Sequence, residues 1–290
     1  MTNPASGTAL GPMLAVAVEQ FTPLAQRLVE DDLARQFLPP VVKALVSLTR
    51  WTPVRNFLSR IADKRGCGVW GGVLCRKRFI DDKLVEALQD GIQAVVNLGA
   101  GFDTRLYRIP AVSALPVFEV DLPENIEAKK LKLQRVFGKV PSHVRLAPVD
   151  FSQQELGSVL PSYGYDSQMK TFFIWEAVTQ YLTEPAVRKT FDFLAQAQAG
   201  SCLAFTYIRQ DFMDGSAIEG AEIVYQVYRI KMQLWHFGLA PQQVPAFLSQ
   251  YSWEEIEQAG SAEYAARYLQ SRGRIMPVTE IERAVYAVKI

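Results

Sequence analysis

Residues 94–108 have the composition of a loop that can bind a nucleotide cofactor. A β-branched apolar run precedes Gly99 and Gly101, and a helical pattern follows. This order is typical of a strand, a glycine-rich turn and a helix, because a residue without Cβ lets backbone N–H groups approach a ligand. A dinucleotide-binding loop has a third glycine, G-x-G-x-x-G. Here Thr104 occupies that position, which favours an adenosine-bearing cofactor other than NAD.

Acidic residues follow three further predicted strands, each at the point where its strand ends. Asp121 lies twenty residues after Gly101, Asp150 precedes Phe151, and Glu176 follows an apolar run. In a doubly wound sheet the carboxyl ends of the strands meet at one edge, where a cofactor binds. A carboxylate there can accept charge-assisted hydrogen bonds from ribose hydroxyls or from an adenine amino group. Asp and Glu also follow strands as turn and capping residues, but three in succession favour a cofactor site.

Positioning these residues requires a sheet whose strands alternate with helices. Apolar runs predict the strands, and apolar residues at helical spacing predict the helices between them. The alternation implies parallel βαβ units in an α/β fold. A last strand is predicted at 283–290 and a helix at 253–269, and a sixth strand is not placed. The other predicted strands are 94–98, 116–121, 144–149, 171–177 and 202–208, and the helices between them are 104–109, 124–136, 153–159 and 184–198.

Prolines and glycines divide the chain further. Interruptions by four prolines predict several short helices before residue 66. The glycines between Gly66 and Gly72 predict a loose connection. The predicted organisation is a flexible tail at 1–12, an N-terminal helical cap at 13–75, a cofactor-binding core at 76–208, a helical insertion or lid at 209–250, and the C-terminal end of the core at 251–290.

Composition narrows the class of protein. The chain has 290 residues, 49% of them apolar, and a formal net charge of +1. Residues 43–78 contain nine Lys and Arg residues and one acidic residue, Asp63, so this segment has a local excess of positive charge of +8. Such an excess is typical of a solvated helix face, and less typical of a surface that steers an anionic substrate or binds nucleic acid. Three cysteines without C-x-x-C spacing and two distant histidines indicate no metal site. The apolar run 13–18 is too short to span a membrane and no signal peptide is indicated, which favours a cytoplasmic protein.

Five segments share their order and spacing with one known family. They are Arg76-Lys-Arg78-Phe-Ile-Asp81-Asp82, Val96-Asn-Leu-Gly99-Ala-Gly101-Phe-Asp103-Thr104-Arg105, Phe118-Glu-Val-Asp121-Leu-Pro123, Val149-Asp150-Phe151 and Trp175-Glu176-Ala-Val-Thr-Gln-Tyr181-Leu182-Thr183. Over about residues 15–205 the chain resembles the leucine carboxyl methyltransferase family, in its bacterial branch of S-adenosyl-L-methionine-dependent methyltransferases. The resemblance implies an α/β, Rossmann-like class I methyltransferase fold. Its doubly wound sheet is seven-stranded and mostly parallel, with an antiparallel last strand.

The same resemblance implies S-adenosylmethionine as cofactor and roles for single residues. An arginine before the first strand is expected to bind the methionine carboxylate, and the spacing does not decide between Arg76 and Arg78. Asp121 is expected to hold the ribose, and Asp150 and Phe151 to contact the adenine. The expected cofactor-binding residues are Arg76, Arg78, Gly99, Ala100, Gly101, Asp121, Leu122, Asp150, Phe151 and, near the methionine moiety, Glu176. Residues 103–105 are expected to cap a helix and fix the loop.

The nature of the methyl acceptor decides whether a base is needed. Methyl transfer is an in-line displacement at a sulfonium, for which an enzyme aligns and desolvates the nucleophile. A carboxylate is already ionised at neutral pH, whereas a hydroxyl needs a base, most often His. His236 is the local candidate for that base, and Tyr181 and Tyr207 could orient an acceptor. All three also fit ordinary packed or surface positions.

The expected partner is a small molecule with a carboxyl or hydroxyl group. A protein C-terminus or tRNA is an alternative acceptor for the same cofactor. A nicotinamide-dependent oxidoreductase is a second alternative, against which the missing third glycine and the lack of a Tyr-x-x-x-Lys pattern count. Acceptor specificity is expected to come from the N-terminal helices and the 209–250 insertion.

Overall fold

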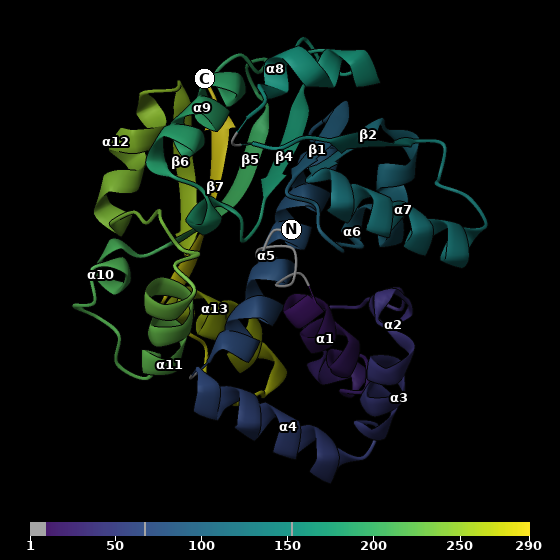
Figure 1. Cartoon of the computed structure of the whole chain (residues 1–290), viewed down its shortest axis with the longest axis vertical. Helices are drawn as coiled ribbons and strands as arrows, with labels where there is room; N and C mark the ends of the chain where they lie inside the picture. Colours follow the sequence, from purple (N-terminus) through teal and green to yellow (C-terminus); the bar gives the residue numbers. More distant parts are fainter. Residues whose placement is uncertain (1–9, 67, 152) are drawn as a thin grey trace.

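The computed structural model describes residues 10–66, 68–151 and 153–290. Its strands are β1 (Ala94–Leu98), β2 (Val117–Asp121), β3 (Val144–Pro148), β4 (Thr171–Trp175), β5 (Cys202–Ile208), β6 (Trp253–Ala259) and β7 (Glu282–Lys289). They form one sheet in the order β3-β2-β1-β4-β5-β7-β6 (Figure 1). Strands β1 to β5 are parallel, and β7 is antiparallel to both of its neighbours. The predicted seven-stranded, mostly parallel sheet with an antiparallel last strand is confirmed.

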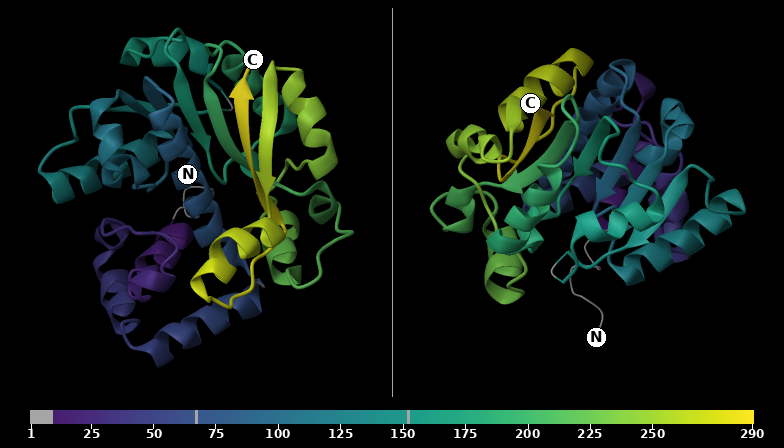
Figure 2. Two further views of the ribbon diagram at one scale, coloured as in Figure 1. Left: turned by 180° about the vertical axis from the view of Figure 1, so that it is seen from behind. Right: turned by 90° about the horizontal axis from the view of Figure 1, so that it is seen from above.

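Helices cover both faces of the sheet (Figure 2). They are α1 (Leu10–Glu19), α2 (Ala34–Phe37), α3 (Pro40–Leu48), α4 (Thr52–Arg65), α5 (Val69–Gln89), α6 (Arg105–Arg108), α7 (Pro123–Phe137), α8 (Leu156–Val159), α9 (Glu184–Leu194), α10 (Gln210–Met213), α11 (Glu222–Val224), α12 (Val244–Ser249) and α13 (Ser261–Tyr264). Neighbouring strand residues alternate between two apolar cores. Val95 and Phe172 pack with α1, α5 and α7, whereas Val96 and Phe173 pack with α8, α9 and α12.

Helix α5 joins the N-terminal helices to the sheet. It begins at Val69, so the predicted domain boundary after residue 75 falls inside it. The prediction of a loose connection is wrong at Gly71 and Gly72, which lie in this helix. A Cβ on Gly71 would clash with the carbonyl oxygen of Pro277. These glycines therefore allow α5 to pack closely against a segment that precedes the last strand.

The helix predicted at 253–269 is wrong over its first half. Residues Trp253–Ala259 form β6, the strand that the sequence did not place, and a β-bulge lies between Glu255 and Glu257. The glutamates favour helix over strand, but pairing with β7 and burial of Trp253 and Ala259 override that preference. Only the second half, from Ser261 onward, is helical.

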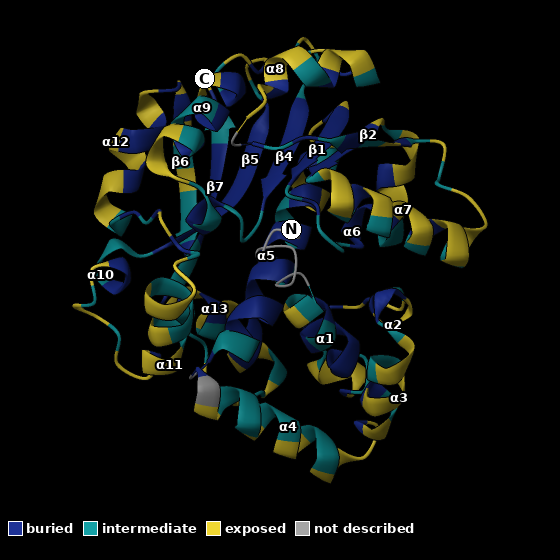
Figure 3. Ribbon diagram, in the orientation of Figure 1, coloured by how far each residue is buried: buried dark blue, intermediate teal, exposed yellow. Residues whose placement is uncertain are grey.

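The ends of the other predicted segments are refined. Helix α1 begins at Leu10, so the predicted tail of residues 1–12 is too long by three residues, and 1–9 lie outside the described residues. The 209–250 insertion contains α10, α11, a π-helical turn at Tyr225–Lys231, and α12. Figure 3 shows a buried sheet and an α4 whose described residues are intermediate or exposed. Over 10–66, 68–151 and 153–290, no helix is long and apolar enough to cross a membrane.

Candidate functional site

The glycine loop after β1 is closely packed. Gly99 and Gly101 have φ angles of +72° and +43°, in the region that favours glycine. A Cβ on Gly99 would clash with Cγ2 of Val178. The N–H groups of Gly99 and Ala100 both donate to the Val120 carbonyl, at 2.8 and 2.9 Å. The glycines therefore serve close packing, and the idea that they free these N–H groups for a ligand is corrected.

Asp121 ends β2 and fixes the glycine loop. Its Oδ2 accepts a hydrogen bond from the N–H of Gly101 at 2.6 Å. Its Oδ1 accepts from the N–H of Leu122 and from Nδ2 of Asn125, both at 2.7 Å. The residue is 7% exposed and lines a cavity. These donors hold a carboxylate at the cavity wall in a single orientation.

A buried ion pair between Lys129 and Glu119 also supports the glycine loop. Nζ of Lys129 donates to Oε1 of Glu119 at 2.6 Å and to the carbonyl oxygen of Ala100 at 3.3 Å. Both side chains of the pair are fully buried, and the Tyr107 hydroxyl also donates to Glu119. Burial raises the pKa of Glu119 above its ordinary value, although these partners act against that rise. Glu119 thus stabilises the loop, while Asp121 lies at the cavity.

Asp150 and Phe151 follow β3 and line the same cavity. Oδ2 of Asp150 accepts a hydrogen bond from Nε2 of Gln153 at 3.0 Å, and its N–H donates to Oε1 of Gln154 at 3.0 Å. Phe151 is 8% exposed and belongs to the core beneath the sheet edge. The pair therefore presents an acceptor group and an aromatic ring side by side at the third strand end.

Glu176 follows β4 and is the centre of an ion-pair network. Its Oε1 lies 3.0 Å from Nε of Arg76 and 3.3 Å from Nζ of Lys77. Its Oε2 lies 2.8 Å from Nη2 of Arg105. Arg76 also pairs with Glu282 of β7, which follows it by more than two hundred residues in the sequence. The network joins α5, α6 and two strands at one end of the cavity.

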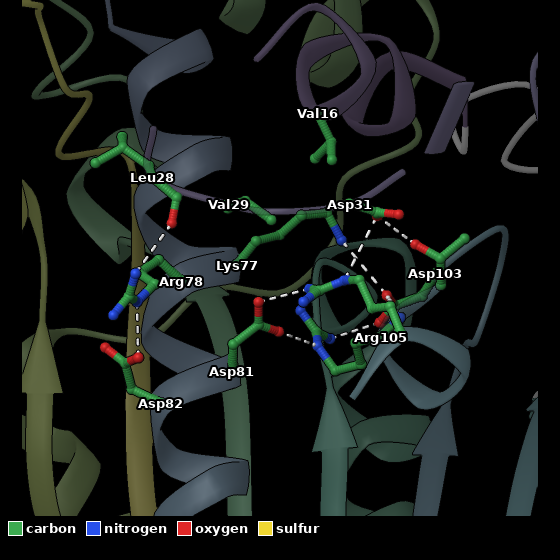
Figure 4. A network of polar contacts seen from close by, with 12 residues as sticks. Val16, Leu28, Val29, Asp31, Lys77, Arg78, Asp81, Asp82, Asp103 and Arg105 are labelled. Carbon is green, nitrogen blue, oxygen red and sulfur yellow. Dashed lines mark hydrogen bonds and ion pairs between the residues drawn. The ribbon is translucent and has the colours of Figure 1, made fainter. Parts of the chain in front are cut away.

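Arg105 connects this network to the loop before α6. The residue is fully buried, and its Nε lies 2.9 Å from Oδ1 of Asp81. Its Nη1 lies 2.5 Å from Oδ2 of Asp103, and its N–H donates to that carboxylate at 3.1 Å (Figure 4). Burial alone would lower the pKa of Arg105, but its carboxylate partners raise it above its ordinary value. These contacts agree with the expectation that residues 103–105 fix the loop. The expected helix cap is not made by Thr104, because its hydroxyl donates to Asp31 and makes no capping hydrogen bond to α6.

The network makes the free energy of unfolding depend on pH. Burial alone would raise the pKa of Glu176, but its three cationic partners lower it well below its ordinary value of 4.5. Below pH 4.5 the unfolded chain therefore takes up a proton here and the folded chain does not. The stability that this carboxylate contributes is complete above that pH and is lost as pH falls, by about 1.4 kcal/mol per pH unit.

We expect the variant Glu176→Gln to lose stability less steeply in acid than the unchanged protein, because it has no proton to take up at this position. Urea denaturation at several values between about pH 7 and pH 3 measures the two slopes. Glu184→Gln is the control, because that carboxylate is 59% exposed in a surface pair. A slope in Glu176→Gln equal to that of the control would contradict the assignment.

The structure separates the two candidate arginines. Arg76 lines the cavity and is 6% exposed. Arg78 lies outside the described lining residues, with Nε 2.7 Å from Oδ1 of Asp82 and Nη1 3.4 Å from the carbonyl oxygen of Leu28. Figure 4 shows the side chains of Arg78 and Lys77 leaving α5 in different directions. The expectation that Arg78 contacts the cofactor is therefore not supported, and Arg76 is the remaining candidate.

The three candidates for contact with an acceptor are placed differently. Tyr181 and His236 line the cavity, and the N–H of His236 donates to the carbonyl oxygen of Gln180 at 2.7 Å. Tyr207 is fully buried in β5, and its hydroxyl donates to Oε1 of Gln258 at 2.7 Å. Burial raises the pKa of Tyr207 above its ordinary value. The prediction that Tyr207 orients an acceptor is corrected, because it is a core residue outside the described cavity lining.

One cavity of about 650 Å³ collects most of the predicted residues. Those that line it are Arg76, Gly99, Ala100, Gly101, Asp121, Leu122, Asp150, Phe151, Glu176, Tyr181 and His236. Lys77, Asn97, Asn125 and Glu282 also line it and were not predicted. Lys77 lies inside the segment Arg76-Lys-Arg78 that carries the family resemblance, so the sequence does hold a signal for this residue. Glu282 has no sequence signal, since only the folded sheet brings it to Arg76. In the part of the chain that the structure describes, no group of three His, Cys, Asp or Glu residues could hold a metal.

Comparison with known sequences gives one consistent family. A family model for leucine carboxyl methyltransferase matches residues 9–195. A Mycobacterium avium (strain 104) protein, provisionally named an S-adenosyl-L-methionine-dependent methyltransferase, is 33% identical over 138 residues, 47% of this chain and 46% of its own. A protein with the same name from Mycolicibacterium paratuberculosis (strain ATCC BAA-968 / K-10) is 26% identical over 288 residues, 92% of this chain and 88% of its own. In the first of these matches the chain spans about half the length of the curated relative.

Solved structures share the fold. A Thermobifida fusca YX protein, provisionally described as a methyltransferase, has a TM-score of 0.58 at 14% identity, covering 81% of this chain and 88% of that one. A Bordetella parapertussis protein, provisionally described as exported, has a TM-score of 0.50 at 12% identity, covering 100% and 99%. At these identities the likeness shows the fold alone.

Proposed function

Since the chain belongs to the leucine carboxyl methyltransferase family, we propose that it is an S-adenosylmethionine-dependent O-methyltransferase acting on a carboxyl or hydroxyl group of a small molecule. The observation that carries the proposal is the convergence of Asp121, Asp150 and Glu176, from three different strand ends, on the cavity that Arg76 also lines. A nucleotide cofactor in a doubly wound sheet binds at such an edge.

The side chains at this edge fit the parts of S-adenosylmethionine. We propose that Asp121 accepts hydrogen bonds from both ribose hydroxyls, as charge-assisted bonds. Asp150 and Phe151 would receive the adenine, with its amino group on the carboxylate and its ring against the phenyl group. Arg76 bonds its two carboxylate partners through Nε and Nη1. Within the described residues its Nη2 makes no hydrogen bond, and we assign this nitrogen to the methionine carboxylate.

When bound, S-adenosylmethionine supplies an electrophilic methyl group on a sulfonium. The chain then has to align the acceptor and remove water from it, which are the contributions that accelerate such a displacement. An acceptor carboxylate is ionised at neutral pH and needs no base. For an acceptor hydroxyl, His236 is the histidine of the insertion that lines the cavity.

A transfer experiment tests the proposed function. The protein is incubated with methyl-labelled S-adenosylmethionine and a metabolite extract, and label is followed into small molecules, precipitated protein and RNA. We expect label in a small molecule, as a mass shift of one methyl group. Release of the label as methanol in mild base identifies a carboxyl ester, and stable label identifies an ether. Label only in protein or RNA would redirect the proposal to those acceptors.

The fold gives tRNA little support as the acceptor. An RNA site needs a continuous exposed basic surface. Part of the basic segment 43–78 is not available for such a surface, because Arg76 and Lys77 are 6% and 5% exposed and point into ion pairs. Arg55 is turned inward as well, since it donates to the carbonyl oxygen of Phe21 at 2.9 Å.

The two arginines of the recognised segment give a matched test of the cofactor site. We expect Arg76→Gln to weaken binding of S-adenosylhomocysteine about tenfold or more, because it removes a charged hydrogen-bond donor from the methionine carboxylate. Arg78→Gln is expected to change the affinity less than about twofold. Isothermal titration calorimetry measures both, and circular dichroism checks that each variant is folded. Equal losses in the two variants would contradict the assignment of Arg76.

A further inference from the structure

The two ends of the cavity differ in chemistry. The charged residues that line it gather at the strand ends and the adjoining turns of α5, the end assigned above to the cofactor. Most of the remaining lining is apolar or aromatic and comes mainly from α1, the first turns of α5, the segment after β4, the 224–236 segment and the residue before β7. Its polar members are Asn97, Asn125, Gln180, Thr279 and His236. We call this part the acceptor wall and define it by Leu14, Trp70, Val224, Tyr228, Leu234 and Ile281.

None of the six residues of the acceptor wall is charged, and His236, which also lines the cavity, lies two residues after Leu234. The two cations among the described lining residues are already paired, Arg76 with two carboxylates and Lys77 with Glu176. A multiply charged acceptor would therefore lose its hydration without gaining partners there, which is unfavourable. An apolar surface gains free energy by leaving water for the same wall.

The wall is also shaped before any acceptor arrives. The rings of Tyr228 and Trp235 stack with centroids 4.9 Å apart and planes 11° apart. Trp235 is 7% exposed and also packs against Phe212. Trp70 of α5 and Leu14 of α1 pack against the core that includes the N-terminal helices. Rigid aromatic surfaces of this kind suit a flat or extended apolar ligand.

We propose that the methyl acceptor has an apolar body, aromatic or aliphatic, that lies against the acceptor wall, and one carboxyl or hydroxyl group that faces the charged end of the cavity. This inference rests on the proposed function and adds the substrate class to it. An apolar acceptor body accounts for the apolar residues that the N-terminal helices and the 209–250 insertion contribute to the cavity lining.

A binding experiment on the full chain tests the substrate class without requiring turnover. The protein is saturated with S-adenosylhomocysteine and titrated in a calorimeter with 2-naphthoate or with malonate, an apolar and a polar carboxylate. We expect naphthoate to bind at least about tenfold more tightly than malonate. Malonate binding as tightly as naphthoate, or no measurable binding of naphthoate, would overturn the inference.

Variants locate the bound probe. We expect Leu234→Asp and Trp70→Asp each to weaken naphthoate binding about tenfold or more, with the affinity for S-adenosylhomocysteine unchanged. Leu131→Asp is the control, because Leu131 is 55% exposed on α7, outside the described cavity lining. Two variants on different segments keep the test decisive if one fails to fold. Unchanged naphthoate binding in folded variants overturns the inference. Failure of the unchanged protein to bind S-adenosylhomocysteine overturns the proposed function itself.

Discussion

Replacing Asp121 by alanine is expected to weaken binding of S-adenosylhomocysteine about 100-fold. The variant loses two proposed charge-assisted hydrogen bonds to the ribose, each with a net contribution of about 1.5 to 3 kcal/mol. It also frees the N–H groups of Gly101 and Leu122, which the carboxylate now holds at 2.6 and 2.7 Å. The loop that carries the cofactor would then lose its fixed shape, so both effects act in the same direction.

Calorimetric titration measures this loss, and two variants make it specific. Asp121→Asn keeps the size of the side chain but removes its charge, so we expect an intermediate affinity. Glu127→Gln on the same helix-strand unit is the control, because Glu127 is exposed and pairs with Lys130 at the surface. Unaltered affinity in Asp121→Ala would remove the ribose assignment.

Replacing Arg105 by methionine is expected to lower the free energy of unfolding by about 3 to 5 kcal/mol, because it leaves buried carboxylates without their cation. Three of them, on Asp81, Asp103 and Glu176, contact this guanidinium. The total free energy of unfolding of a folded domain is about 5 to 15 kcal/mol, so the variant should be close to the limit of folding.

Thermal denaturation followed by circular dichroism measures this effect. The matched control is Arg188→Met, which removes an ion pair between side chains that are 41% and 59% exposed and should change Tm little. A Tm of Arg105→Met equal to that of the control would show that the network contributes nothing to stability. Expression of Arg105→Met at reduced temperature provides folded protein for the comparison.

The parallel part of the sheet could be predicted because its strands are short apolar runs between turn signals. Strand β6 could not, since its glutamates have a helical preference and only pairing with β7 makes it a strand. The helical position of Gly71 and Gly72 could not be predicted for a similar reason. Their role is contact with a segment two hundred residues later, which no local pattern encodes.

The cavity was predictable in part. That Asp121, Asp150 and Glu176 lie together at it could be predicted, because parallel strands bring their carboxyl ends to one edge. The choice between Arg76 and Arg78 was not, because residues two apart on a helix point in different directions and the sequence does not say which direction faces the sheet edge. The acceptor wall depends on packing between the cap, α5 and the insertion, so its composition became visible only in the fold.

The cavity at the strand ends is proposed to bind S-adenosylmethionine. Titration of the purified protein with S-adenosylhomocysteine and, separately, with NAD tests it most directly. The proposal predicts saturable binding of S-adenosylhomocysteine at one site and no heat of binding with NAD. Binding of NAD without measurable affinity for S-adenosylhomocysteine would contradict it.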